Sequence, residues 1–439
     1  MNNRKWIGWC SVLFFSCVGH TQTISLHPEP ADWYSGDIHV HRNCGDPIDL
    51  LSESKLGKMM EDNDLSVISV LADMGNAEVR DSKTDLLNVT GKDALQSSAK
   101  RIIHWDTEWH WDATYSNFSN QALGGHLVLL GLKHAEQIWD ESPYKILEWA
   151  SRQHAVKGFA HMEYLNNTIQ DTLNCCIPID FPVEAALGNI DFVSEDVYGK
   201  GSPNNGNYNS EAAMQGYYKL LNCGFQLGLA AGTDYPCNGK EPLGKLLTYA
   251  QVSGKLTYNS WIGAIKKGRT VVSRNGHQEF LSLSLDGKAG PGQTVLMKNK
   301  KPVAVRVTWT ADTRQSGHIE LVCNGKVVAT REGTADRGKP LVLDTTITVN
   351  QSSWFCARRM DGDEHQSHTS AAYASLNGKP VRASAADAEY FVSWIDNILA
   401  NIEPGHKWNR YFTHDLQTVQ ARYRKAKNIY KKIAGEVIR

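Results

Sequence analysis

Between Trp33 and about Arg274, short apolar runs alternate with amphipathic stretches of helical spacing, and this alternation limits the folds open to the chain. Three of the amphipathic stretches are predicted helices, at Leu50–Asp62, Tyr144–His154 and Ser210–Cys223. The predicted strands are Ser35–His41, Ser66–Ala72, Ile102–Glu108, His126–Lys133, Gly158–His161, Asp191–Glu195 and Phe225–Asp234. Strands that alternate with helices predict an α/β domain with a mainly parallel sheet, open or closed into a barrel.

The pattern changes after this region. Glu279–Met360 reads as successive β segments, and Asn324-Gly325 is a favoured two-residue hairpin turn between two of them. From Ala385 onward the spacing is helical, with a second helix at about Asp415–Val437. We therefore expect an α/β domain at 33–277, a small antiparallel β-sandwich at 278–382 and C-terminal helices at 383–439.

The N-terminus has the pattern of an export signal. Arg4 and Lys5 precede the apolar run Trp6–Val18, which is too short to span a bilayer. Residues 1–22 are predicted to be a signal peptide of a soluble protein exported to the periplasm or the medium. Lipidation at Cys17 is the less favoured alternative. No later segment approaches membrane-spanning length.

Composition excludes some function classes. The 439 residues carry 46 basic and 47 acidic side chains, and a net charge of -1 argues against a nucleic-acid binder. The 13 Trp suit cores, and also pockets for sugars or aromatic ligands. Cys323 and Cys356 lie in strand-like segments, where a disulfide and two buried free thiols are both open.

The segment 36–41 carries the first candidate for chemistry. On a strand, residues i and i+2 point to the same face, so His39 and His41 can bind one metal ion. With 16 histidines, one such triplet arises easily by chance. Position adds weight, because the pair ends a strand early in an α/β domain, where barrel active sites form.

Other ligand-type residues fall at similar places. Asp73, Glu108, His161 and Asp234 each end a predicted strand, whereas His126 opens one and departs from this rule. The carboxyl ends of parallel barrel strands share one rim, so these side chains are expected to converge. Buried charges need partners, and a divalent metal would satisfy several at once. The alternative is that each is a separately solvated or hydrogen-bonded residue.

These motifs resemble those of the PHP (polymerase and histidinol phosphatase) metallohydrolase superfamily. Trp33–His41 is similar to its first motif, and the closer similarity is to the carbaryl-hydrolase-like CehA/McbA branch. The resemblance spans about Trp33 to Ile402, and its specificity lies in the order of the motifs. Supporting segments are Gly125–Gly131, Phe159–His161, Ala231–Asp234, Ala264–Val272, Glu320–Gly325, Trp354–Arg358 and His368–Ser370.

The resemblance implies a distorted (βα)7-type barrel with metal ions at its C-terminal rim. By position, His39, His41, Glu108 and Asp234 would hold one ion, and Glu108 would bridge to a second, held also by His126 and His161. Three departures from the family pattern all affect a third ion: Asp73-Met74, Asp234-Tyr235-Pro236, and the absence of histidine from Arg42–Pro47. The sequence thus predicts two ions, with Asp46 at the edge of the site. Zn or Mn is favoured, and Fe is also open.

Two ions bridged by a carboxylate imply a hydrolase. A hydroxide between them would attack an ester, carbamate or phosphoester bond, with Glu108 and Asp234 holding the ions. Glu195 ends another strand, and could orient a ligand, shuttle protons or be a solvated rim carboxylate. Asp106 shares the strand face of Glu108 and is the rival bridging ligand.

Three tryptophans surround Glu108 in sequence. Trp105, Trp109 and Trp111 either pack beneath the rim, the favoured interpretation, or form a wall for a small aromatic or sugar-containing substrate. We expect an exported metal-dependent hydrolase. The alternatives are an amidohydrolase-type barrel enzyme and a catalytically silent glycan- or ligand-binding protein on the same scaffold. The sequence leaves the substrate and the oligomeric state open.

Overall fold

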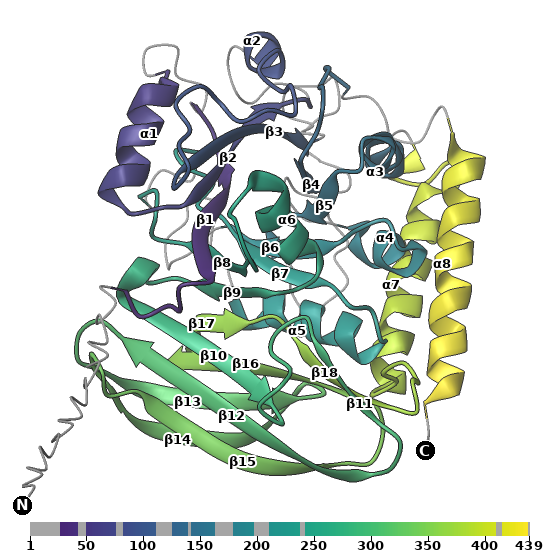
Figure 1. The fold of residues 1–439 in the computed structure, drawn as a ribbon. Helices are drawn as coiled ribbons and strands as arrows, with labels where there is room; N and C mark the ends of the chain where they lie inside the picture. Colours follow the sequence, from purple (N-terminus) through teal and green to yellow (C-terminus); the bar gives the residue numbers. More distant parts are fainter. Residues whose placement is uncertain are drawn as a thin grey trace, which may run out of the picture.

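The computed structural model describes residues 27–42, 50–75, 82–110, 125–138, 142–162, 179–196, 210–237, 242–409 and 415–437. These residues form an α/β region, a β-rich region and a pair of long C-terminal helices (Figure 1). The helices are α1 (Glu53–Asp62), α2 (Ser82–Leu86), α3 (Pro143–Arg152), α4 (Phe181–Leu187), α5 (Ser210–Asn222), α6 (Tyr258–Lys266), α7 (Ala385–Ile402) and α8 (Leu416–Glu436), with the short 3-10 helix η2 (Gly276–Gln278).

Nine strands belong to the α/β region. They are β1 (Trp33–Val40), β2 (Val67–Asp73), β3 (Ile102–His110), β4 (His126–Leu130), β5 (Val156–Phe159), β6 (Phe192–Glu195), β7 (Gly228–Ala231), β8 (Leu247–Gln251) and β9 (Thr270–Ser273). Side by side they run in the order β9-β8-β1-β2-β3-β4-β5-β6-β7. Pairing is parallel within β1-β2-β3 and within β5-β6-β7, and antiparallel on both sides of β4. The expected α/β region is confirmed. Its sheet is mixed, however, and not mainly parallel.

Strands β1 and β7 approach each other but do not form a complete ladder. Among the described residues β7 has no ladder to β1, and the link is a single parallel bridge between Val40 and Tyr235. The His41 N–H donates to the Tyr235 carbonyl at 2.6 Å. Inside the curved sheet lies a small apolar cluster, which includes Ile38 of β1 and Trp261 of α6. The structure thus has a strongly curved sheet filled by side chains, and no closed barrel in the part that it describes.

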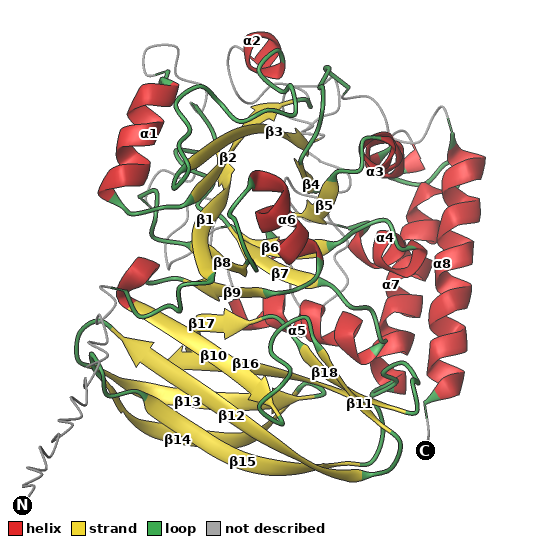
Figure 2. Ribbon diagram, viewed as in Figure 1, coloured by secondary structure: helices red, strands yellow, loops and turns green. Residues whose placement is uncertain are grey.

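The β-rich region consists of two layers. A three-stranded antiparallel sheet orders β10-β12-β15, and it packs on further strands that continue the large sheet (Figure 2). Its strands are β10 (Glu279–Leu285), β11 (Thr294–Met297), β12 (Lys301–Ala311), β13 (Gln315–Cys323), β14 (Lys326–Ala335), β15 (Leu341–Val349), β16 (Ser353–Asp361), β17 (Glu364–Thr369) and β18 (Ala372–Leu376). Strand β17 pairs with β9, so one 15-stranded sheet runs through both regions.

The C-terminal helices α7 and α8 pack against each other along one side of the molecule, beside α4 (Figure 1). Ser384 caps the N-terminus of helix α7. Its side chain accepts a hydrogen bond from the Asp387 N–H, which has no partner within the helix. It buries Phe391 and Trp394 in the main core. No described helix is long and apolar enough to cross a membrane.

The strand pairing shows whether Cys323 and Cys356 form a disulfide. Cys323 lies opposite Phe355, and Cys356 lies opposite Val322, in the β13–β16 ladder. Directly opposed residues share a face, so the two sulfurs point to opposite faces and both remain free thiols. Burial raises the pKa of Cys323 to about 12, so this thiol stays protonated at neutral pH. Cys237 is in a disulfide.

Candidate metal centre

Six buried side chains from five parts of the α/β region meet at one end of its sheet. They form two groups of ligand atoms, each within 4.8 Å of one another, and Glu108 belongs to both. The first group is His39, His41, Glu108 and Asp234, and the second is Glu108, His126 and His161. These are the six residues that the sequence predicts. We call them the metal centre.

An irregularity near the end of β1 sets the direction of two histidine side chains, His39 in the strand and His41 just after it. The register with β2 shifts between Asp37 and Val40, as in a β-bulge. Ile38 packs in the small inner cluster, whereas Val40 packs in the larger outer one. The extra residue therefore turns His39 and His41 inward after Ile38, which is how bulges re-aim side chains beside active sites. The Asp37 carboxylate holds the turn by accepting the His39 N–H at 2.9 Å.

The structure distinguishes the two rival carboxylates on β3. Glu108 Oε2 lies 3.2 Å from His39 Nε2 and 3.0 Å from His41 Nε2, and Oε1 lies 2.7 Å from His126 Nδ1. Asp106 shares this strand face but binds elsewhere: it accepts the Gly131 N–H at 2.6 Å and the Tyr258 hydroxyl. Glu108 is therefore the residue that joins the two groups.

His126 fits the centre because β4 is antiparallel to both of its neighbours. The first residue of β4 lies opposite His110, near the end of β3, so a residue that opens β4 reaches the same end of the sheet as residues that close β3 and β5. His161 follows β5, and its ring centroid lies 4.9 Å from that of His126. His126 opens its strand, unlike the other members of the centre, because β4 runs in the opposite direction to β3 and β5.

Two members of the centre have left-handed backbone conformations. His161 has φ 57° and Asp234 has φ 50°. Residues other than glycine are uncommon there, and such strain gathers at functional sites, although Asp and His tolerate it better than most. Asp234 Oδ1 lies 3.3 Å from Nε2 of both His39 and His41.

Residues behind the centre orient its histidines. His41 Nδ1 lies 3.1 Å from the Leu71 carbonyl, which leaves Nε2 to face the carboxylates. Asp196 Oδ1 lies 3.3 Å from His39 Nδ1, while its Oδ2 accepts the His161 N–H at 2.8 Å. Such partners fix the tautomer and direction of metal-binding imidazoles. Asp196 and Asp37 were not predicted from the sequence. Asp196 directly follows β6, so the strand-end rule was the available signal.

The charges in the centre are strongly coupled. Burial opposes a charge on His41, but Asp234 and Glu108 outweigh it and raise the His41 pKa to about 9. The same two carboxylates hold the pKa of buried His39 well above its ordinary value. Burial likewise opposes ionised Glu108, yet His39 and His126 hold its pKa well below the usual range. The site therefore holds ionised carboxylates that attract positive charge.

The donor set fits divalent metal ions. Four imidazoles and two carboxylates are ligands of Zn²⁺ and related transition metals. His39 Nε2, on the side away from Asp196, makes no regular hydrogen bond with the described chain, although the residue is fully buried. Buried polar groups normally have hydrogen-bond partners. The carboxylates of Glu108 and Asp234 lie 3.2 and 3.3 Å from His39 Nε2, which is the arrangement expected of atoms that bind the same cation.

Two other residues predicted for the site, Asp73 and Glu195, belong to neither group, although Asp73 lies beside Glu108 in the β2–β3 ladder. Asp73 is buried at the end of β2 and accepts the Gly75 N–H at 2.8 Å. Glu195 binds Arg274, with Nη2 at 2.7 Å, and His365, at the boundary with β17. Glu195 is therefore a buried ion-pair partner and not the solvated rim carboxylate that was one of the alternatives.

The tryptophans follow the alternation of β3. Trp105 and Trp109 are buried in the larger apolar cluster, on the strand face opposite Glu108. Their indole N–H groups donate to Glu53 and to the Ile138 carbonyl. Both are placed as packing residues, in agreement with the favoured interpretation. Asp46 and Trp111 lie outside the described residues.

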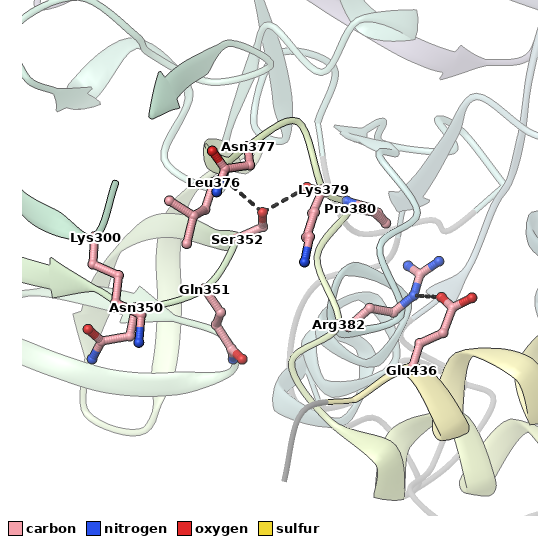
Figure 3. A pocket seen from close by; sticks show the side chains of 10 residues that line it. All are labelled: Lys300, Asn350, Gln351, Ser352, Leu376, Asn377, Lys379, Pro380, Arg382 and Glu436. Atoms are coloured by element: carbon pink, nitrogen blue, oxygen red, sulfur yellow. Dashed lines mark hydrogen bonds and ion pairs between the residues drawn. The ribbon is translucent and has the colours of Figure 1, made fainter. Parts of the chain in front are cut away.

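One described cavity lies far from these residues in the chain. It has a volume of about 600 Å³ and opens between the β-rich region and the end of α8 (Figure 3). None of the metal-centre residues line it, and Arg382 and Glu436 form an ion pair at its edge. Its lining residues are Lys300, Asn350, Gln351, Ser352, Leu376, Asn377, Lys379, Pro380, Arg382 and Glu436.

Comparison with known proteins gives no family. No protein-family model and no curated protein matches the chain. One similar solved structure is the CARDB domain of PF1109 from Pyrococcus furiosus, at 12% identity and TM-score 0.18, over 23% of this chain and 98% of that one. Another is an engineered protein, at 13% identity and TM-score 0.16, over 45% of this chain and 44% of that one.

Proposed function

We propose that the protein is a metal-dependent hydrolase of the PHP type, with two divalent ions in the metal centre. One observation carries this proposal: Glu108 belongs to both groups of ligand atoms, so a single carboxylate is placed to bridge two ions. The CehA/McbA resemblance implies the same residue, Glu108, as the bridge between two ions.

The shape of the sheet also supports the proposal. The curved sheet β1–β7 brings the six side chains to one end, and the Val40–Tyr235 bridge draws its two edges together there. We interpret this sheet as a distorted (βα)7-type barrel that lacks one complete ladder. The β4 reversal is part of that distortion.

The residues of the centre define what a substrate would meet. When bound, two divalent ions would polarise a carbonyl or phosphoryl oxygen and lower the pKa of a nearby water. Glu108 and Asp234 supply negative charge that holds such ions. Asp196 keeps the His39 ring oriented, and the Leu71 carbonyl does the same for His41. Ester, carbamate and phosphoester bonds are the substrate classes for this chemistry.

Export is part of the proposal. The N-terminal signal pattern predicts it, and the disulfide at Cys237 is the kind of bond that persists in oxidising compartments. The proposed substrate is a small molecule, aromatic or sugar-containing, as the tryptophan-rich composition suggests.

Elemental analysis coupled to a substrate panel tests the function. Wild-type protein is expected to hold two ions that depend on the metal centre and to hydrolyse an aryl ester or an aryl phosphodiester. The His39→Ala/His41→Ala variant is expected to lose the ion of the first group and the activity. His406→Asn, which changes an exposed histidine, is the matched control and should behave as wild type.

Two outcomes would contradict the proposal. If the His39→Ala/His41→Ala variant kept all of its metal, the site would be wrong. If the loaded wild type hydrolysed nothing in a broad panel yet bound glycans, a binding protein on this scaffold would be the better interpretation.

A further inference from the structure

A second set of ligand-type side chains meets away from the metal centre, where the N-terminal segment passes the boundary between the two regions. His27 and Glu29 precede β1, and His277 lies in η2, between β9 and β10. Each offers one ligand atom, and these atoms lie within 4.8 Å of one another. We call these three residues the junction site.

The junction site lies at the opposite end of the strands. His27 Nε2 is 2.8 Å from Asp64 Oδ2, and Asp64 lies just before β2 begins. The metal centre lies where β1 and β3 end, so the two sets do not share a site. No member of one set belongs to the other.

Local contacts hold the three residues in place. The Thr310 hydroxyl donates to the Pro28 carbonyl at 3.0 Å, which fixes the segment that carries His27 and Glu29. On the other side, Gly276 has φ 56°, and a Cβ there would lie 2.7 Å from the Gly244 carbonyl oxygen. Only glycine suits this turn, which presents His277 to Glu29.

Two buried atoms at the junction site point to a missing ligand. Glu29 Oε1 lies 2.9 Å from His277 Nδ1, and the side chains are 10% and 15% exposed. Glu29 Oε2 and His277 Nε2 are buried, and neither has a hydrogen bond with any described residue. A simple Glu29–His277 ion pair satisfies one atom of each side chain and leaves the other without a partner, which is costly for buried polar atoms.

We infer that the junction site binds one divalent transition-metal ion, with Zn²⁺ the best fit. Two imidazoles and one carboxylate are a standard zinc ligand set, with a fourth position for water or another oxygen. Asp64 stands behind His27 in the way that carboxylates orient metal-binding imidazoles.

The proposed ion would act as a structural clip. Glu29 and His277 are 248 positions apart in the sequence, so one ion would close a very long loop of chain. Cross-links that close long loops remove the most conformational entropy from the unfolded chain. The ion would fasten the segment before β1 to the point where the chain enters the β-rich region.

Zinc counting by mass spectrometry on the full chain, after reconstitution with Zn²⁺ and removal of loose metal, tests this inference. Wild type is expected to hold three ions, and Glu29→Gln/His277→Asn two. The Glu108→Gln variant, which changes the carboxylate shared by both groups of the metal centre, should retain one ion, the junction ion, and Zn²⁺ should still raise its melting temperature by a few degrees. His406→Asn should hold three.

The outcomes are separable from those for the proposed function. A Glu29→Gln/His277→Asn protein with the wild-type zinc count would overturn the junction site, as would loss of every ion from Glu108→Gln. If the double junction variant does not fold, anomalous scattering at the zinc edge from wild-type crystals decides. A peak beside His277 supports the inference, and its absence contradicts it.

Discussion

The Asp196 carboxylate lies directly behind the His39 ring, with Oδ1 3.3 Å from Nδ1, and its other oxygen accepts the backbone N–H of His161. One buried side chain thus supports a ligand from each group of the metal centre. Its hydroxyl partner Ser194 donates to Oδ2 at 2.6 Å, which fixes the carboxylate itself.

Asp196→Asn is expected to lower zinc affinity at the metal centre about 10- to 100-fold, because an amide orients and polarises the His39 imidazole less well. Competition with a chelator of known affinity measures the loss. Circular dichroism should show an unchanged fold. Wild-type affinity in the variant would mean that the His39–Asp196 contact has no part in binding.

Glu108→Gln and Asp106→Asn are expected to separate the two carboxylates of β3. Glu108→Gln should lose both ions of the metal centre, since both groups depend on that side chain. Asp106→Asn should keep them, because its amide can still accept the Gly131 N–H and can donate to Tyr258. Its unfolding free energy should change by no more than about 1 kcal/mol. Metal loss from Asp106→Asn would reverse the assignment.

Gly232→Ala is expected to disrupt the metal centre through packing alone. A Cβ at this position would lie 2.5 Å from the His39 Cβ and 2.8 Å from the His39 backbone nitrogen, closer than real contacts allow. We expect a loss of about 1–3 kcal/mol in stability and weakened metal binding. Gly263→Ala in α6 is the matched control. Nothing lies within 4 Å of its added Cβ, so it should stabilise by about 0.5–1 kcal/mol.

The contact between α4 and α8 gives a pH-dependent prediction. Burial raises the pKa of Asp180 to about 7, and the Tyr423 hydroxyl donates to this carboxyl. The folded state therefore binds the extra proton between pH 4 and 7, so unfolding free energy falls as pH rises through this window. The contribution is at most about 1.4 kcal/mol per pH unit. Asp180→Asn should flatten that slope in urea unfolding from pH 4 to 8. A slope equal to that of wild type would contradict the prediction.

The sequence predicted which side chains gather in the two groups better than it predicted their surroundings. The spacing of His39 and His41 indicated a shared strand face, and the structure places both in one group. Strand ends then indicated Glu108, His161 and Asp234. These residues do lie together, as expected, because strand ends in an α/β sheet are set by local patterns of apolar residues.

What the sequence missed depends on relations between distant strands. The direction of β4 comes from pairing with β3 and β5, and no local pattern reveals it. The inner face of β1 changes at a bulge that only its pairing with β2 defines. Strands β8 and β9 were also missed, because they are short and lie on either side of helix α6 in the sequence. The junction site joins residues 248 positions apart, which no spacing rule connects.

The pairing of β17 with β9 determines how the protein can be shortened. Thr369, His368 and Ser367 lie opposite Val271, Val272 and Ser273 in that ladder. A fragment that ends at residue 277 would strip β9 of this neighbour and leave a bare row of amide and carbonyl groups, which invites aggregation. Expression trials that aim for the α/β region alone should therefore yield insoluble material, and the smallest workable version must extend at least through β18.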